Sequence, residues 1–264
     1  MHIDLTGRTA LVTGSTSGIG HAIATAFARA GARVVVNGRD EKRTDEAAAR
    51  IRAETGNPEV HPVAADVGTE EGAEALIAAE PDVDILVNNA GIFAATPVFE
   101  IPDEEWLRYF EVNVLSGVRL ARHHTPRMVG RGWGRVVFVS SESAVHPSTE
   151  MVHYSMTKTA QLAISRGIAQ AVPATGVTVN SVLPGPTLTP GVEKFIADRV
   201  GPGVPFEEAE RRFIAEERPT SLLGRLARPE EVADLVLYVS SEQASATTGA
   251  ALRVDGGVIP TLIP

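Results

Sequence analysis

A tyrosine and a lysine, Tyr154 and Lys158, stand four residues apart in the segment HYSMTKTA. On a helix this spacing puts both side chains on one face, one turn apart. At ~4 Å and an effective dielectric of ~20, an ammonium stabilises a tyrosinate by roughly 4 kcal/mol, or about three pKa units, before desolvation opposes it. The pair therefore predicts either a general acid/base whose pKa Lys158 lowers, or an ordinary exposed pair on a helix surface.

The bulk composition excludes several classes of function. The 264 residues include 44% hydrophobic and 22% charged residues, the balance of a globular protein with a core. A formal net charge of −9 argues against nucleic-acid binding, and the lack of cysteine excludes disulfides and thiolate chemistry. The first residues do not form a signal peptide, and no apolar run approaches the ~20 residues of a membrane span. We expect a cytoplasmic protein without membrane association.

Short β-branched runs alternate with Ala-rich, charged stretches along the chain. Strands are expected at residues 10–13, 33–37, 60–64, 84–88, 135–140, 177–182 and 251–255. Helices are expected at residues 18–30, 41–55, 70–79, 103–128, 151–172 and 229–241. This alternation predicts an α/β, doubly wound fold in three layers, with a mainly parallel seven-stranded sheet between helices. No internal boundary is visible, so residues 1–264 are expected to form a single domain.

One stretch, residues 186–223, breaks this alternation. It is rich in Pro, Gly, Glu and Arg and contains the helical patches VEKFIADRV and FEEAERRFIAEE. Long excursions of this kind in α/β domains often cover a site, so the stretch is interpreted as a substrate lid. The alternative is a surface insertion without a role.

The segment VTGSTSGIGHAIA (residues 12–24) predicts a strand, a glycine-rich turn and a helix. Glycines let backbone amides approach a pyrophosphate, and the N-terminus of the following helix favours an anion. The spacing is G-x-x-x-G-x-G rather than G-x-G-x-x-G. The residues expected to hold a dinucleotide here are Gly14, Ser15, Thr16, Ser17, Gly18, Ile19 and Gly20.

The end of the second expected strand, Asn37-Gly38-Arg39, bears on which dinucleotide binds. An acid at this point would accept hydrogen bonds from a free ribose 2′-hydroxyl, but position 38 is glycine. Arg39 can pair with a 2′-phosphate, because guanidinium binds such groups in a bidentate manner. The sequence favours NADP(H), while the neighbouring Asp40 keeps NAD(H) possible.

Further motifs follow in order along the chain: NNAG at 88–91, Asn113 in EVNVLSG, SS at 140–141, Tyr154 with Lys158, LPGPTLT at 183–189 and TGAALRVDGG at 248–257. Together with TGSTSGIG, this set resembles the short-chain dehydrogenase/reductase (SDR) family over nearly the whole chain. The resemblance implies a Rossmann-like domain, a nicotinamide cofactor and oxidoreductase activity on a carbonyl/alcohol substrate.

The resemblance also assigns roles to individual residues. Ser141, thirteen positions before Tyr154, matches the serine that orients the substrate oxygen, with Ser140 as the competitor. Asn113 matches the fourth catalytic residue, which is thought to hold a water connected to Lys158. Tyr154 and Lys158 are also expected to contact the cofactor. The other cofactor contacts that the resemblance implies are Asp66, Val67, Asn88, Ala90, Gly91, Pro184, Gly185, Thr187 and Thr189.

Several alternatives stay open at this point. The substrate is a 3-oxoacyl thioester, or a polyol or sugar acid; the protein is otherwise a catalytically silent dinucleotide-binding regulator or a nucleotide-sugar epimerase. No metal-ligand pattern occurs among the histidines. Glu142, His146 and His153 lie close to the catalytic segment without an assignable role. The helices that carry Asn113 and Tyr154 have small and apolar residues on their faces, so we expect a homo-oligomer, either a tetramer or a dimer.

Overall fold

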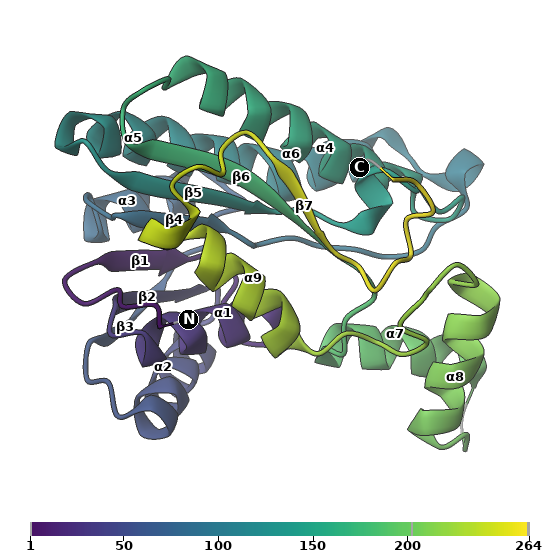
Figure 1. Ribbon diagram of the computed structural model, residues 1–264. Helices are drawn as coiled ribbons and strands as arrows, with labels where there is room; N and C mark the ends of the chain where they lie inside the picture. The colour runs from purple at the N-terminus through teal and green to yellow at the C-terminus, as the bar shows by residue number, and fades with distance from the viewer. Residues whose placement is uncertain (1, 202, 263–264) are drawn as a thin grey trace.

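A computed structural model describes residues 2–201 and 203–262. Seven strands form one sheet in the order β3-β2-β1-β4-β5-β6-β7, and all of their pairings are parallel (Figure 1). The strands are β1 (Thr9–Val12), β2 (Arg33–Gly38), β3 (Val60–Ala64), β4 (Ile85–Asn88), β5 (Gly134–Val139), β6 (Val177–Pro184) and β7 (Ala251–Val254). The predicted Rossmann-like α/β fold is confirmed. The strand order reverses between β1 and β4, which is where such sheets bind ligands.

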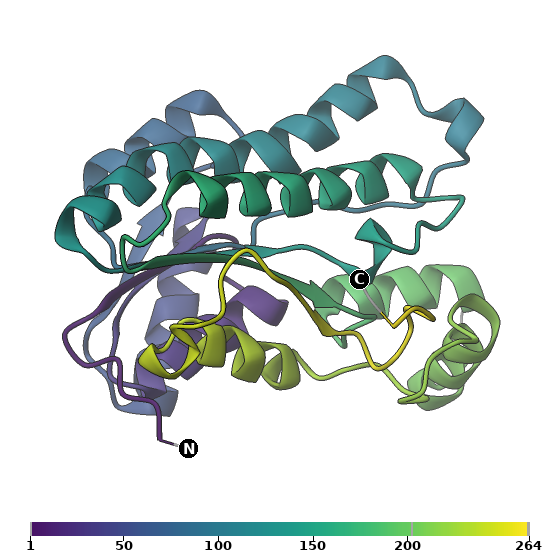
Figure 2. The ribbon, with the colours of Figure 1, turned by 45° about the horizontal axis from the view of Figure 1, so that its top comes forward.

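Helices cover both faces of the sheet, so that the molecule has three layers (Figure 2). They are α1 (Gly18–Arg29), α2 (Glu41–Thr55), α3 (Glu70–Ala79), α4 (Asp103–Phe110), α5 (Ser116–Arg131), α6 (Val152–Ala171), α7 (Pro190–Val200), α8 (Phe206–Glu217) and α9 (Pro229–Val239). Within the described part of the chain, no helix combines the length and the apolar character needed to cross a membrane.

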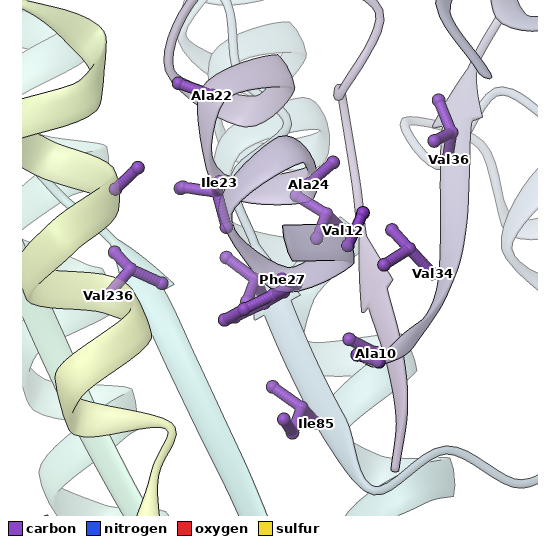
Figure 3. Close-up of a cluster of buried hydrophobic side chains, with 14 of the residues drawn as sticks. Ala10, Val12, Ala22, Ile23, Ala24, Phe27, Val34, Val36, Ile85 and Val236 are labelled. Carbon is purple, nitrogen blue, oxygen red and sulfur yellow. The ribbon is translucent and has the colours of Figure 1, made fainter. Parts of the chain in front are cut away.

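Each face of the sheet has its own hydrophobic core. Alternate residues of a strand point to opposite faces, so Val34 and Val36 pack with α1, α2 and α9, while Val35 packs with α3, α5 and α6. Figure 3 shows the first core, in which Phe27 of α1 and Val236 of α9 lie against the sheet. Burying one such side chain contributes about 1.5–3 kcal/mol, so both faces hold the carboxyl ends of the strands in place.

The helix expected over residues 103–128 is interrupted. Between α4 and α5 the chain makes a π-helical turn, Glu111–Leu115, which contains the buried Asn113. Gly117 follows close to the sheet: a Cβ at this position would lie 2.9 Å from Cε1 of Phe138 and 3.2 Å from Cγ of Asn88. π-Helical turns inside helices are frequent at functional sites, and this one turns the Asn113 side chain towards the loop after β4.

The stretch over residues 186–223 contains α7 and α8, which pack on each other through Ile196, Phe213 and Ile214. Figure 1 shows this pair of helices beyond the end of the sheet. Arg199 of α7 forms ion pairs with Glu150, in the loop before α6, and with Glu217 of α8. The two helices are therefore tied to each other and to the loop between β5 and α6.

Candidate active site

A cleft of about 320 Å³ opens at the carboxyl ends of the strands. Its walls come from the glycine-rich turn after β1, the loops after β4, β5 and β6, and the helices α6, α7 and α8. Ser17, Gly18, Ile19 and Gly20 line one end. Ser141, Tyr154 and Lys158 line the same cleft, so the predicted dinucleotide turn and the predicted catalytic residues share one cavity.

The glycine-rich turn has the shape of an anion cradle. Gly14 and Gly18 have positive φ angles of 61° and 58°, which favour glycine. A Cβ on Gly20 would lie 2.5 Å from the carbonyl oxygen of Gly14, so this position has no room for a side chain. No side chain caps the first turn of α1 at Ser17, and that turn contains no acid. Its backbone N–H groups are therefore left for an anion such as a pyrophosphate, and the residues present fit the group.

The loop after β4 supports this turn. The Asn89 side chain donates hydrogen bonds to the carbonyl oxygens of Thr13 (2.9 Å) and Gly14 (3.1 Å). Asn89 and Gly91 line the cleft, whereas Asn88 is buried against Gly117. The sequence therefore pointed to Asn88 where the structure brings its neighbour Asn89 to the turn. A strand that ends at Asn88 turns adjacent side chains in opposite directions, and this register was the missing information.

The remaining predicted cofactor residues are distributed along the same edge. Pro184, Gly185, Thr187 and Thr189 follow β6 and line the cleft. Asp66 and Val67 follow β3, farther along the edge and beside the end of β2. Predicted residues that the structure leaves out of the cleft wall are Ser15, Thr16, Arg39, Asp66, Val67, Asn88 and Ala90. Ser15 is fully buried, and its hydroxyl donates to the Val12 carbonyl (2.7 Å).

The end of β2 has room for a phosphate but not for an acidic side chain at position 38. A Cβ on Gly38 would lie 2.4 Å from Cγ2 of Thr16. The Asp40 carboxylate accepts a hydrogen bond from the Arg43 N–H (2.8 Å) and so caps α2. Arg39 is exposed and makes no hydrogen bond or ion pair within the described residues. Its guanidinium is free to meet an anion at this edge.

Ser141 and Tyr154 meet at the cleft wall between β5 and α6, where their hydroxyl groups form a hydrogen bond. Lys158 lies one helical turn beyond Tyr154, with its Nζ 5.5 Å from the centroid of the phenol ring. This Nζ donates to the Val139 carbonyl (2.9 Å) and to Oε1 of Gln161 (3.4 Å). The competitor Ser140 donates to the backbone carbonyl of Lys158 (2.9 Å). The hydroxyl of Ser140 is therefore engaged in holding α6, which leaves Ser141 as the partner of Tyr154.

Asn113 lies behind the catalytic residues and not in the cleft wall. Its Oδ1 accepts from the Ile92 N–H (2.8 Å), and its Nδ2 donates to the carbonyl oxygen of Ile92 and to Oγ1 of Thr157 (both 3.0 Å). Its backbone carbonyl accepts from Nε2 of Gln161 (2.7 Å). Gln161 thus connects Lys158 to Asn113 directly. The sequence analysis missed Gln161, although its place one turn after Lys158 on the same helix was a usable signal.

The electrostatics of the pair differ from the expectation. Burial raises the pKa of Tyr154, and the Glu142 carboxylate raises it further, while the hydrogen bond with Ser141 acts in the opposite direction. Burial lowers the pKa of Lys158 to about 8. The prediction that Lys158 lowers the pKa of Tyr154 is therefore wrong for the protein on its own. Desolvation of the phenol outweighs the attraction of an amine that is itself close to losing its charge.

The structure also places the three residues without a role. Glu142 is buried in the cleft wall, where its carboxylate accepts a hydrogen bond from Ser141 and pairs with Arg218 of the 186–223 stretch. His146 is exposed and does not line the cleft. His153 is buried between Trp106 and Tyr109, with ring centroids 6.1 Å and 4.0 Å away. Of the three, only Glu142 can reach a molecule in the cleft.

Comparisons with known proteins agree with this site. A family model described as short chain dehydrogenase matches residues 8–199. The uncharacterized oxidoreductase YvaG of Bacillus subtilis is 51% identical over 260 residues, 98% of each chain. The D-beta-hydroxybutyrate dehydrogenase of Cupriavidus necator is 36% identical, over 96% of this chain and 98% of that protein. The L-sorbose reductase of Gluconobacter frateurii, solved with NADPH and L-sorbose, superposes with a TM-score of 0.92 and 36% identity, over 99% of this chain and 100% of the reductase. The chain therefore belongs to the short-chain dehydrogenase/reductase family of oxidoreductases.

Proposed function

We propose that this protein is an NADPH-dependent reductase that converts a small ketone into an alcohol. The observation that carries the proposal is the convergence of Ser141, Tyr154 and Lys158 on the cleft that the glycine-rich turn also lines. A dinucleotide-binding regulator has no need for a proton donor beside its cofactor cleft. The complete set therefore favours an enzyme over a silent binding protein.

Each of these residues has a distinct task in the proposed reaction. Bound NADPH supplies the hydride, which goes to the carbonyl carbon while the π-electron pair moves to the oxygen. Ser141 donates a hydrogen bond that orients the oxygen, and Tyr154 gives it the proton that completes the hydroxyl group. Lys158 stabilises the tyrosinate that this proton transfer leaves behind. Gln161 and Asn113 hold the Lys158 amine through the hydrogen bonds described above.

The pKa of Tyr154 bears on the direction of the reaction. Because burial and Glu142 raise this pKa, the phenol keeps its proton at neutral pH. Reduction of a carbonyl needs the protonated phenol, whereas oxidation of an alcohol needs the tyrosinate. The site is therefore set for reduction near neutral pH, and oxidation is expected to become faster in alkaline solution.

The choice of NADPH over NADH rests on the end of β2. Gly38 has no room for the acid that would bind a free ribose 2′-hydroxyl, and the carboxylate of Asp40 is engaged as a helix cap. Arg39 is the free cation at this edge, and a guanidinium binds a phosphate through charge-assisted hydrogen bonds. The cofactor in the related L-sorbose reductase is also NADPH.

Replacing Arg39 by alanine is expected to lower the preference for NADPH over NADH at least about tenfold, mainly by raising KM for NADPH. The physical reason is the loss of charge-assisted hydrogen bonds to the 2′-phosphate. The ratio of kcat/KM for the two cofactors measures the effect. Arg211→Ala removes an equally exposed arginine from α8 and should leave the ratio unchanged. An Arg39→Ala variant with the full wild-type preference would contradict the assignment.

The helices α7 and α8 are proposed to act as a substrate lid. Val192 and Phe195 of α7 line the cleft together with Phe213 of α8 and Arg218 directly after it. The ion pairs of Arg199 with Glu150 and Glu217 fasten this cover to the loop before α6. Ion pairs near the surface are weak, typically up to about 1 kcal/mol, so the cover can open for substrate and cofactor.

The experiment that tests the proposed function follows NADPH absorbance with a panel of carbonyl compounds. The panel contains ketoses, keto sugar acids, 3-oxo acids and 3-oxoacyl thioesters, which represent the open substrate classes, and a UDP-sugar epimerase assay runs beside it. NADPH oxidation that depends on one of the ketones supports the proposal. Binding of NADPH without turnover of any compound would leave a dinucleotide-binding protein, and activity on the UDP-sugar alone would point to an epimerase.

A further inference from the structure

The pair formed by Glu142 and Arg218 is a polar feature in the cleft that the reaction described above does not use. The two side chains are 7% and 15% exposed, respectively, and Oε1 of Glu142 lies 3.3 Å from Nε of Arg218. Glu142 comes from the loop after β5, while Arg218 comes from the end of α8. Both residues line the cleft. The lid therefore brings a charge to the side of the cleft where Ser141 and Tyr154 stand.

Glu142 is also joined to the catalytic serine. Its Oε2 accepts the hydroxyl hydrogen of Ser141, while the Ser141 oxygen accepts from the Ser143 N–H (3.1 Å). When a substrate carbonyl takes the hydrogen of Ser141, Oε2 of Glu142 loses that donor. A buried carboxylate oxygen without a donor is costly, so a substrate that brings its own donor gains affinity.

We infer that Glu142 and Arg218 form a second recognition point for a hydroxyl group next to the reacting carbonyl, so that the cleft selects neutral α-hydroxy ketones, the class that includes ketoses. The substrate carbonyl lies on Ser141 and Tyr154, and its neighbouring hydroxyl donates to Oε2 of Glu142. Reduction then gives a vicinal diol. This inference rests on the proposed function and specifies its substrate class.

The charge of the pair argues against anionic substrates. Glu142 and Arg218 neutralise each other, so a carboxylate in the cleft would have to compete with Glu142 for the guanidinium and would lie close to a like charge. A 3-oxo acid is therefore disfavoured. A 3-oxoacyl thioester is neutral at this point but carries no hydroxyl donor beside its ketone. Among the related proteins, the sugar-reducing one thus has the substrate that suits this cleft better than hydroxybutyrate does.

The remaining wall suits the carbon skeleton of a small molecule. Phe93, Met151, Phe195 and Phe213 line the cleft, and Phe93 lies edge-on to both Tyr154 and Phe195 with ring centroids 6.3 Å and 6.2 Å apart. These side chains offer no hydrogen-bonding charge. The polar selectivity of the substrate end therefore depends on Glu142 and Arg218.

Three ketones of similar size test the inference on the wild-type protein: 3-hydroxybutan-2-one, butan-2-one and 3-oxobutanoate. They differ in the group beside or near the carbonyl: a hydroxyl, no polar group, or a carboxylate. With NADPH, kcat/KM for 3-hydroxybutan-2-one is expected to exceed that for butan-2-one at least about tenfold, the range of a hydrogen bond to a charged group. The anion 3-oxobutanoate is expected to be the poorest of the three.

Two substitutions of Glu142 then separate recognition from a merely structural role. Glu142→Ala removes the acceptor and should bring the ratio of 3-hydroxybutan-2-one to butan-2-one close to one. Glu142→Gln keeps the shape but releases the charge of Arg218, so relative activity on 3-oxobutanoate should rise about tenfold. Arg211→Gln on the exposed face of α8 is the matched control and should change neither ratio. A gain on one substrate cannot result from misfolding.

The possible results are distinguishable. No NADPH oxidation with these ketones or with the wider panel would remove the proposed function itself. Wild-type protein that reduces butan-2-one as well as 3-hydroxybutan-2-one would leave the reductase but overturn the inference. An equal loss on all three ketones in both Glu142 variants would also overturn it, because Glu142 would then only orient Ser141.

Discussion

Replacing Tyr154 by phenylalanine is expected to lower kcat for ketone reduction by about 10²–10⁴-fold, the usual contribution of a positioned proton donor. The substitution removes only the phenolic hydroxyl. The ring remains able to pack edge-on to Phe93. NADPH affinity, measured by the fluorescence of the bound cofactor, and the melting temperature should therefore stay close to the wild-type values while turnover is lost.

Tyr109→Phe is the matched control for this experiment. Tyr109 of α4 is also a buried phenol, but it packs on His153 outside the cleft. Burial raises the pKa of Tyr109 as well, so a buried phenol as such is present at both positions. The account requires that only the loss of the Tyr154 hydroxyl stops the reaction. Retention of most of kcat in Tyr154→Phe, or an equal loss in Tyr109→Phe, would be incompatible with it.

Lys158→Met is expected to lower kcat by roughly a hundredfold and to remove the alkaline limb of the pH profile. At ~5 Å and an effective dielectric of ~20, the ammonium stabilises the developing tyrosinate by about 3 kcal/mol, which is roughly a hundredfold in rate. The pKa of Lys158 is about 8, so wild-type kcat/KM for reduction should fall as pH rises through that value. The methionine variant should show a low and flat profile between pH 7 and 9, taken across this pKa.

The same substitution has a stability signature with a definite sign. Since burial lowers the pKa of Lys158, the unfolded chain binds more protons than the folded protein between pH values of about 8 and 10.5. Wild-type stability from this residue therefore rises with pH across that window, and the methionine variant should lack the rise. Lys194→Met, on the exposed face of α7, is the control for both measurements. An unchanged alkaline limb in Lys158→Met would show that another group titrates.

The strands could be predicted from the sequence because short, β-branched runs between glycines leave little choice of structure. The glycine-rich turn was equally readable, since Gly14, Gly18 and Gly20 stand where side chains would not fit. The interruption of the helix at Asn113 was not readable. It depends on hydrogen bonds between Asn113 and Ile92, and on the close approach of Gly117 to Phe138, which bring together different elements.

The site shows the same division. Tyr154, Lys158 and Ser141 could be placed by spacing and resemblance, because they lie close together in the chain. The partner of Glu142 could not, since Arg218 is 76 residues away and reaches the cleft only through the packing of α8. The direction of the pKa change at Tyr154 was also missed. It depends on the burial of the phenol and on Glu142, and neither can be read from the spacing of two residues.

Transfer of deuterium from NADPH labelled at both C4 positions tests the central claim most directly. The account predicts that the alcohol formed from an α-hydroxy ketone carries one deuterium on the former carbonyl carbon, in equal amount to the NADPH oxidised. This outcome requires the cofactor and the carbonyl to react within one cleft. An alcohol with protium at that carbon, or NADPH oxidation without alcohol formation, would contradict the account.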